Sequence, residues 1–203
     1  MGRLDEKAAI VTGGGRGIGR GIVLELANEG ADIVIGDIDL ANAERTADEV
    51  RAFGRKCSVV EVDVTDEDSA RDGVETAIAE RGGIDILVNN AGVVADHVGA
   101  AITLGDWDKC YEVNLKGIWI MSNAVIPHFR EREQGKIVNI ASIAGRQGGR
   151  GLAPYNASKA GVISLTQSLA AEFGPRNINV NAVCPGLLWT DMWRQLEGMF
   201  QRD

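Results

Sequence analysis

The sequence predicts an α/β fold, a doubly wound parallel sheet in a single domain that spans residues 1–203. Two observations predict it. Short β-branched runs, several of them apolar almost throughout, alternate with longer segments of helical periodicity, and strands buried on both faces of a parallel sheet have this pattern. The segments between these runs are short, and no Pro- or Ser-rich hinge divides the chain, so one domain is expected.

Strands and helices are expected to alternate along the whole chain. The predicted strands are Ala8–Thr12, Asp32–Gly36, Ser58–Val62, Asp85–Asn89, Lys136–Ile140 and Ile178–Val183. The predicted helices are Ile18–Glu29, Ala41–Phe53, Glu67–Arg81, Trp107–Arg132 and Ala153–Phe173. In the first helix, an apolar stripe runs from Ile22 to Ala27 at helical spacing. Strands and helices in this order imply right-handed βαβ units.

Composition and charge argue against several classes of protein. The chain carries 21 Lys and Arg against 29 Asp and Glu, a net charge of −8, and an acidic surface repels the phosphates of a nucleic acid. Its apolar runs fall well short of the ~18 residues that a membrane span needs. The three cysteines are far apart and lack metal-ligand spacing, so no metal site is expected. Acidic residues near the N-terminus argue against a secretory signal, and we expect a reduced, cytoplasmic protein.

A glycine-rich turn, T-G-G-G-R-G-I-G over residues 12–19, follows the first predicted strand. Its spacing is T-G-x-x-x-G-x-G, and no three of its glycines fit G-x-G-x-x-G. Gly13, Gly17 and Gly19 permit positive φ and let backbone N–H groups approach a phosphate, with Arg16 and Ile18 between them. Because the turn leads from the first strand into the first helix, it favours dinucleotide binding over a purely structural loop.

An acidic residue, Asp37, ends the second predicted strand, 18 positions beyond the last glycine of the turn. A carboxylate here can accept both ribose hydroxyls of NAD and repels the 2′-phosphate of NADP, whereas Arg16 could pair with that phosphate. We give Asp37 the greater weight and expect NAD. The alternative is that Asp37 caps a helix beginning near Leu40. After the third strand, Asp63 and Val64 are candidates for the adenine, with a turn or cap as the alternative role.

Two further motifs follow in order along the chain. The segment N-N-A-G, which ends in Asn90, Ala91 and Gly92, comes after the fourth predicted strand. Tyr155 and Lys159 form a Y-x-x-x-K motif at the start of a predicted helix, and residues four apart lie on the same helix face. Y-x-x-x-K alone is a weak signal. Its combination with the glycine-rich turn and N-N-A-G is a strong one.

With these motifs, the chain resembles the short-chain dehydrogenase/reductase family from its first strand to its last residue. The family uses an Asn–Ser–Tyr–Lys set, and Asn114, Ser142, Tyr155 and Lys159 match it. The resemblance implies a Rossmann fold and hydride transfer between a nicotinamide cofactor and a secondary alcohol or ketone. It assigns Tyr155 as the acid/base.

The expected chemistry explains why these residue types are needed. Free tyrosine has a pKa near 10, so forming tyrosinate at pH 7 costs about 4 kcal/mol. The Lys159 ammonium and the positive nicotinamide ring are expected to lower the pKa of Tyr155. Ser142 would hydrogen-bond the substrate oxygen, and Asn114 would hold a water or kink its helix. Taken alone, Ser142 could be a cap and Asn114 a local backbone binder.

The resemblance also implies the remaining contacts to the cofactor. Asn90 matches the residue beside the cofactor ribose. Pro185 and Gly186, followed by Thr190, match the segment that holds the nicotinamide carboxamide.

Three segments are expected to line the substrate pocket: Val93–Asp96, the irregular piece Ile143–Leu152, and a lid over residues 187–203. The candidate substrate contacts are Ser142, Gln147, Tyr155, Trp189 and Trp193. Both tryptophans could instead pack on the core or on another subunit.

The predicted substrate is a polyol or hydroxyketone, because the C-P-G…T-x-M-W wording at residues 184–193 is similar to that of acetoin/2,3-butanediol and sorbitol dehydrogenases in the family. One alternative is an NADPH-dependent 3-oxoacyl-carrier-protein reductase, for which Arg130 and Arg132 could form a local basic patch. Another is a non-catalytic dinucleotide-binding sensor or scaffold. His97 and His128 lie outside every motif, and we expect them to be structural.

The family resemblance implies a homo-oligomer, usually a tetramer. Relatives continue through a further helix and a seventh strand. We therefore expect the sheet of these 203 residues to end at the sixth strand, without the family's last strand, and to be less stable or less well assembled.

Overall fold

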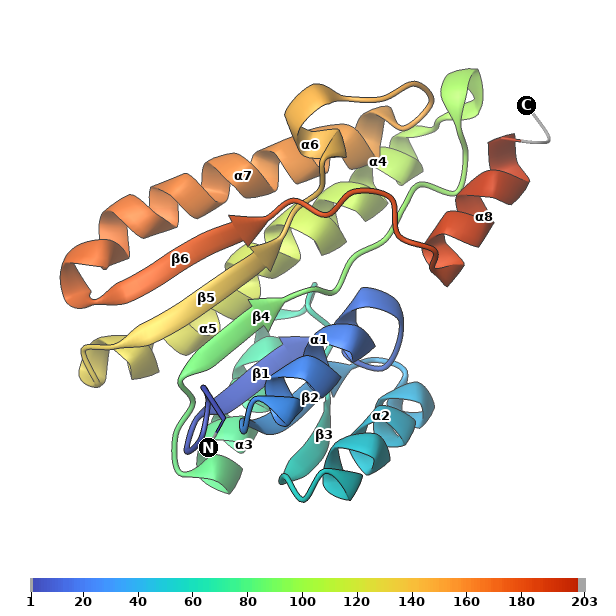
Figure 1. Ribbon diagram of the computed structural model, residues 1–203. Helices are drawn as coiled ribbons and strands as arrows, with labels where there is room; N and C mark the ends of the chain where they lie inside the picture. The colour runs from blue at the N-terminus through green and yellow to red at the C-terminus, as the bar shows by residue number, and fades with distance from the viewer. Residues whose placement is uncertain (1, 201–203) are drawn as a thin grey trace.

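A computed structural model describes residues 2–200, which form one sheet with helices on both faces (Figure 1). All six strands are parallel, in the order β3-β2-β1-β4-β5-β6. The strands are β1 (Ala8–Thr12), β2 (Asp32–Asp37), β3 (Cys57–Glu61), β4 (Ile86–Asn89), β5 (Gly135–Ile140) and β6 (Ile178–Val183). The predicted doubly wound, single-domain fold is confirmed. As expected, β6 is an edge of the sheet in the described part of the chain.

The helices connect the strands as predicted, with two added helices, α6 and α8, and one predicted helix divided in two. They are α1 (Gly17–Asn28), α2 (Leu40–Ala52), α3 (Glu67–Arg81), α4 (Leu104–Tyr111), α5 (Gly117–Glu131), α6 (Ala144–Gln147), α7 (Ala153–Phe173) and α8 (Asp191–Phe200). Short 3₁₀ turns add η1 (Gly99–Ala101) and η3 (Gly174–Arg176). The added α6 lies in the segment expected to be irregular, and α8 lies in the expected lid. Residues 201–203 of that lid fall outside the described residues.

The helix expected over Trp107–Arg132 is not one regular helix. It begins at Leu104 and is divided by a π-helical segment, η2 (Glu112–Lys116), between α4 and α5. A π turn holds one residue more than an α turn, so it shifts the side chains that follow it around the helix axis. Periodicity did not reveal this break, because apolar residues continue on both sides of it.

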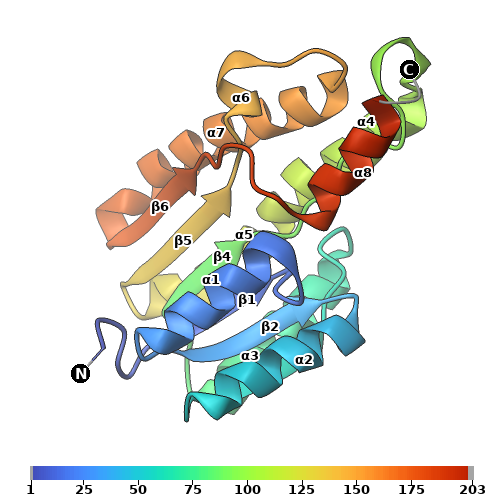
Figure 2. The ribbon, with the colours of Figure 1, turned by 45° about the vertical axis from the view of Figure 1, so that its right-hand side comes forward.

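Two layers of helices cover the sheet. The helices α1 and α2 pack on one face through Val23, Ala27, Ala43 and Ala47, and α3, α5 and α7 cover the other face (Figure 2). All five residues of β1 are buried, which explains its continuous apolar run. The carboxyl ends of the six strands meet at one edge, where an open α/β sheet binds its ligands.

None of the helices formed by residues 2–200 is long and apolar enough to cross a membrane. Across the same residues, no group of three His, Cys, Asp or Glu side chains is placed to hold a metal ion.

Candidate active site

The glycine-rich turn between β1 and α1 is packed too closely for larger residues. A Cβ atom on Gly19 would lie 2.0 Å from the carbonyl oxygen of Gly13. A Cβ on Gly13, where φ is +64°, would lie 2.9 Å from Cα of Ala91. Glycine is therefore required by close backbone approach at both positions and by positive φ at Gly13.

The first turn of α1 has the properties of a phosphate site. Arg16 occupies the N-cap position, and its side chain makes no capping hydrogen bond to the amides that follow. The N–H groups of Gly17, Ile18 and Gly19 open the helix there, and a helix N-terminus attracts anions. A Cβ on Gly17 would lie 3.7 Å from Cγ2 of Thr190, so the Thr190 side chain lies next to the turn. These residues fit the pyrophosphate of a dinucleotide.

Asp37 lies at the end of β2 and supports the turn directly. Its Oδ2 accepts a hydrogen bond from the Gly15 amide at 2.9 Å, and its Oδ1 accepts one from the Asp39 amide at 3.0 Å. The alternative in which Asp37 caps α2 is wrong, because Asp39 is the cap and accepts from the Asn42 amide at 3.1 Å. Hydrogen bonds from Asn42 lower the pKa of Asp39, and the charge of Arg16 adds to this effect. The Arg16 side chain therefore lies close enough to Asp39 for its charge to act on that carboxylate.

The two candidates after β3 have different surroundings. Asp63 is exposed, and its Oδ1 accepts hydrogen bonds from the Thr65 amide at 2.9 Å and the Thr65 hydroxyl at 2.7 Å. Its side chain thus closes a turn, the alternative stated for it. Val64 is buried, and a Cβ on Gly117 would lie 2.8 Å from its Cγ2.

The N-N-A-G segment joins the glycine-rich turn to the catalytic group. Asn90 donates through Nδ2 to the carbonyl oxygens of Thr12 and Gly13, each at 3.0 Å. The Thr12 hydroxyl accepts from the Asn90 and Ala91 amides at 3.0 and 3.1 Å. A Cβ on Gly92 would lie 3.2 Å from Asn114 Oδ1 and 3.5 Å from Lys159 Nζ.

Asn114 sits in the π-helical segment, fully buried. Its Oδ1 accepts from the Val93 amide at 2.8 Å, and its Nδ2 donates to the Val93 carbonyl oxygen at 2.9 Å and to the Ser158 hydroxyl at 3.1 Å. The side chain is thus engaged mainly with backbone. Asn114 thus lies at the π-helical break between α4 and α5.

Lys159 is buried beneath Tyr155. Its Nζ donates to the Ile140 carbonyl oxygen at 2.8 Å and lies 5.9 Å from the centroid of the Tyr155 ring. Burial lowers the pKa of Lys159 to about 8. Burial also raises the pKa of Tyr155, although hydrogen bonding with Ser142 opposes the shift. The expected lowering by Lys159 is therefore wrong for the protein by itself, because loss of solvent around the phenol outweighs the other effects.

Ser142 follows β5 at the carboxyl edge of the sheet and is mostly buried. Its hydroxyl accepts from the Ala144 amide at 3.1 Å, so it also begins α6. Next to it, the Ile143 amide donates to the Pro185 carbonyl oxygen at 2.9 Å, which ties the segment after β6 to this edge. The candidate catalytic group consists of Asn114 from η2, Ser142 from just after the end of β5, and Tyr155 and Lys159 from α7.

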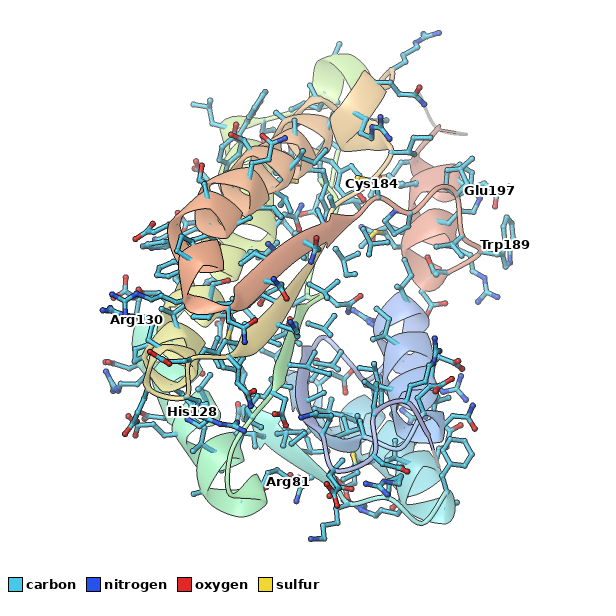
Figure 3. The ribbon with its side chains drawn as sticks, turned by 60° about the vertical axis from the view of Figure 1, so that its left-hand side comes forward. Arg81, His128, Arg130, Cys184, Trp189 and Glu197 are labelled. Carbon is cyan, nitrogen blue, oxygen red and sulfur yellow. The ribbon has the colours of Figure 1, made fainter. Side chains whose placement is uncertain are left out.

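The proposed substrate contacts differ in where they lie. Gln147 is exposed at the end of α6. Trp193 is half-buried on α8, where its amide donates to the Thr190 hydroxyl at 3.4 Å. Trp189 is 68% exposed and stands at the outer edge of the molecule in Figure 3. The two leucines just before it are exposed as well, so this part of the expected lid lies on the surface.

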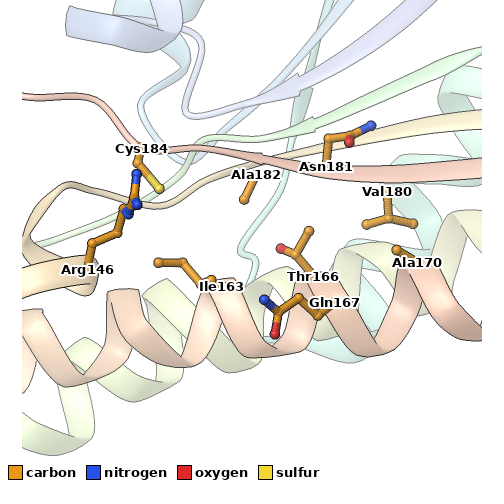
Figure 4. Close-up of a pocket in the computed structure, with 9 residues that line it drawn as sticks. All are labelled: Arg146, Ile163, Thr166, Gln167, Ala170, Val180, Asn181, Ala182 and Cys184. Carbon is orange, nitrogen blue, oxygen red and sulfur yellow. The ribbon is translucent and has the colours of Figure 1, made fainter.

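The hollow beside the edge strand is not the catalytic centre. A groove of about 440 Å³ runs between β6 and α7 (Figure 4). Its lining residues are Arg146, Ile163, Thr166, Gln167, Ala170, Val180, Asn181, Ala182 and Cys184. None of the four catalytic candidates lines it.

His128 and Arg130 lie at the end of the molecule opposite Cys184 and Trp189 (Figure 3). Nε2 of His128 accepts from the Ile84 amide at 3.1 Å, and Arg132 donates to the Ile84 carbonyl oxygen at 2.7 Å. Arg132 also pairs with Asp85 at 3.3 Å. The local basic patch expected from Arg130 and Arg132 is therefore partly neutralised, and it stands at the amino end of β4.

Sequence reasoning missed one buried carboxylate, Asp106 in the first turn of α4. It is 3% exposed and forms a capping box with Thr103. The T-x-x-D pattern before an apolar helix was the available signal. Asp106 also contacts His97, whose Nδ1 lies 3.0 Å from its Oδ2.

Comparison with known proteins agrees with this site. Residues 7–199 match the family described as short chain dehydrogenase. The chain is 39% identical over 194 residues to the 3-oxoacyl-[acyl-carrier-protein] reductase FabG of Thermotoga maritima, covering 96% of this chain and 79% of that relative. It is 40% identical over 193 residues to the (2S)-[(R)-hydroxy(phenyl)methyl]succinyl-CoA dehydrogenase subunit BbsD of Thauera aromatica, covering 95% and 77%.

Solved structures that the chain resembles are also those of a reductase and a dehydrogenase. A 3-ketoacyl-(acyl-carrier-protein) reductase from Brucella melitensis complexed with NADH superposes with a TM-score of 0.90 at 36% identity, covering 95% of this chain and 80% of that chain. NAD⁺-bound xylitol dehydrogenase superposes with a TM-score of 0.88 at 33% identity, covering 91% and 71%. The chain therefore belongs to the short-chain dehydrogenase/reductase family, whose members are oxidoreductases that use a nicotinamide cofactor.

Proposed function

We propose that this protein transfers hydride between a nicotinamide cofactor and the carbonyl carbon of a 3-oxoacyl thioester, with reduction to the 3-hydroxyacyl product. The observation that carries the reaction class is the buried Lys159 beneath the half-buried Tyr155, beside Ser142 and at the edge where the glycine-rich turn also lies. The substrate class rests on the reductases that the chain resembles, several of which carry this activity in their names.

The bound cofactor would supply the hydride in reduction and accept it in oxidation. The Tyr155 phenol donates its proton to the carbonyl oxygen as that oxygen gains charge, so a ketone, a hydride and a proton give the alcohol. The Ser142 hydroxyl hydrogen-bonds the same oxygen. A raised pKa suits Tyr155 to the reductive direction, because it keeps the phenol protonated near neutral pH.

The preferred cofactor is NAD(H) in this proposal. Asp37 supports the turn where the adenosine ribose would lie, and Asp39 stands next to it. Two carboxylates there disfavour a 2′-phosphate, whereas Arg16 and Arg45, whose charges both act on Asp39, favour one. The two structural neighbours named above contain NADH and NAD⁺.

A second candidate is oxidation of a polyol or reduction of a hydroxyketone. The similarity to xylitol dehydrogenase favours it, as do the hydrogen-bonding groups of Arg146 and Gln147 beside the catalytic edge. The non-catalytic sensor or scaffold is disfavoured, because the structure brings the complete Asn–Ser–Tyr–Lys set to one edge of the sheet.

The proposal extends to assembly and location. An exposed surface on η2, α5 and α7, formed around Tyr111, Leu115, Trp119 and Leu165, is available for a second copy of the chain, which supports a homo-oligomer. Sedimentation of the purified protein tests this. Cys57, Cys110 and Cys184 are all free thiols, which supports a reducing, cytoplasmic location.

Initial-rate kinetics test the function. NADH and NADPH are each assayed with an acetoacetyl thioester and acetoin, and NAD⁺ and NADP⁺ are each assayed with xylitol. We expect the highest kcat/KM for the thioester with NADH. A higher kcat/KM for acetoin or xylitol would select the second candidate. Cofactor binding without turnover of any of the three would favour the non-catalytic alternative.

A further inference from the structure

A buried carboxylate outside the catalytic group collects four hydrogen bonds. Oδ1 of Asp106 accepts from the Asp96 amide at 2.7 Å, and its Oδ2 contacts the Thr103 amide at 2.8 Å, the Thr103 hydroxyl at 2.7 Å and His97 Nδ1 at 3.0 Å. Burial would raise the pKa of Asp106. The hydrogen bonds from Thr103, Asp96 and His97 outweigh burial and hold that pKa well below its usual range.

These bonds exceed what a helix cap requires. A capping box needs only the reciprocal contact between Thr103 and Asp106, and both halves of it are present. The contacts to Asp96 and His97 reach back ten and nine residues, into the loop that leaves β4. The same carboxylate thus caps α4 and restrains a loop.

That loop, residues 93–103, begins at the catalytic group. Asn114 holds its first residue, Val93, through both the amide and the carbonyl. Val94 and Ala95 are buried, and the Asp96 side chain pairs with Lys109 at 2.7 Å. Asn114 therefore fixes the start of the loop, and Asp106 fixes its middle and its end.

The loop is also joined to the segment in front of Tyr155. The Gly99 amide donates to the Gly151 carbonyl oxygen at 3.1 Å. Two residues earlier, the Gly149 carbonyl oxygen accepts from Nδ2 of Asn156 at 2.7 Å, and Asn156 is the neighbour of Tyr155 on α7. Hydrogen bonds thus run from Asp106, through both loops, to the start of α7.

We propose that Asp106 is a positioning residue for the substrate, one that holds residues 93–103 and, through Gly99 and Gly151, residues 148–151 where they orient the ketone toward Tyr155. This inference rests on the proposed function, since it assumes that the ketone lies between these two loops. Asp106 touches neither the substrate nor the cofactor in this account.

The test is the isosteric Asp106→Asn variant. One acceptor oxygen becomes an NH₂ group, so either the Asp96 amide or the Thr103 amide loses its partner. We expect the KM for the ketone to rise about 10-fold at saturating cofactor, with a smaller change in kcat and an unchanged cofactor Kd. The graded variant His97→Ala removes a single contact of an exposed side chain, and its KM should rise about 2-fold.

Asp66→Asn is the matched control. Asp66 caps α3 by accepting from the Ser69 amide at 2.9 Å, and none of its contacts reaches the substrate loops. It should lower stability as Asp106→Asn does, yet leave the KM unchanged. Equal KM values for Asp106→Asn and the wild type, or equal KM changes in the two Asn variants, would overturn the inference.

Hydrogen exchange separates this inference from the proposed function. In Asp106→Asn, amide exchange should quicken in residues 96–103 and 148–151 and stay unchanged in residues 12–19. Faster exchange in 96–103 alone would overturn the link between the loops, whether or not any ketone is turned over. If Asp106→Asn does not fold, the same comparison with His97→Ala decides the inference. Lack of turnover by the wild-type protein would count against the proposed function only.

Discussion

The two sides of the active site are built by different means. On the cofactor side, the glycine-rich turn is held by close backbone packing, such that a Cβ on Gly19 would lie 2.0 Å from the Gly13 carbonyl oxygen. On the substrate side, the loops are held by a hydrogen bond that the Asp106 carboxylate accepts and one that the Asn156 side chain donates, and Trp189 is 68% exposed. A closely packed turn can bind a cofactor that many enzymes have in common. A pocket that is specific for one substrate needs loops held by side chains that other residues can replace.

The strands show the same contrast. All five residues of β1, beneath the glycine-rich turn, are buried between helices. Along β6, buried Ile178 and Val180 alternate with exposed Asn179 and Asn181. The central strand therefore offers a rigid base for the turn, whereas β6 and the segment that follows it are covered mainly from one side. Four substitutions test this contrast, in order of decreasing expected effect.

The largest effect is expected on the substrate side, from Tyr155→Phe. The ring stays, and the phenol that donates the proton to the substrate oxygen in the proposed reaction is lost, so turnover should fall about 10³-fold while the cofactor Kd is unchanged. Stopped-flow or steady-state rates, together with fluorescence titration of NADH, measure both. Tyr111→Phe, at the other tyrosine, should leave the rate unchanged. A near-wild-type rate in Tyr155→Phe would remove it as the acid/base.

On the cofactor side, Gly19→Ala should open the turn. The new Cβ collides with the Gly13 carbonyl oxygen, and we expect a loss of about 3 kcal/mol in the free energy of unfolding and about 100-fold weaker cofactor binding. Gly21→Ala is the control on the same helix, because nothing lies within 4 Å of its Cβ. It should stabilise the protein by about 0.5–1 kcal/mol. Similar urea midpoints for the two variants would contradict the account of the turn.

Lys159 lies where the two sides meet, and its burial opposes folding. Because its pKa falls from 10.5 to about 8, the unfolded chain binds more protons than the folded one between these pH values, so this group's contribution to stability rises with pH across that window. Below about pH 8 the full penalty of burying the ammonium, about 3 kcal/mol, is present.

Lys159→Met should therefore raise the free energy of unfolding at pH 7 by about 2 kcal/mol, after about 1 kcal/mol is subtracted for the lost bond to Ile140. Its stability should also lack the rise that the wild type shows from pH 8 to 10.5. Urea unfolding at pH 7 and 9.5 measures both effects. Parallel pH profiles for the two proteins would show that Lys159 is not the group responsible.

The smallest effect concerns the choice of cofactor. Asp37→Ser removes the carboxylate that would repel a 2′-phosphate and leaves Arg16 in place, so the ratio of kcat/KM for NAD to that for NADP should fall about 10-fold. Asp63→Ser, at an exposed turn aspartate, should leave the ratio unchanged. A wild-type protein that already prefers NADP would show that Arg16 outweighs Asp37.

Local sequence patterns predicted those features of the structure that depend on residues close together in the chain. The strand runs, the glycine-rich turn and the pairing of Tyr155 with Lys159 on one helix face all follow from contacts within a few residues. The π-helical break at Glu112–Lys116 was not predictable in this way, because it accompanies the fit of buried Asn114 against Val93. The exposure of Trp189 could not be predicted either, because a pattern of apolar residues does not show which of them lie on the surface.

Periodicity in the sequence predicted the parallel sheet, because it depends on local backbone geometry. The motifs carry the resemblance to the family, and that resemblance assigns the four candidate catalytic residues. Only the tertiary structure decided the protonation tendencies of Tyr155 and Lys159, since burial by distant elements raises one pKa and lowers the other. It also decided that Asp39 caps α2 and that Asp106 joins a helix to a loop. These contacts depend on where the folded chain places side chains relative to backbone groups, which motif spacing does not specify.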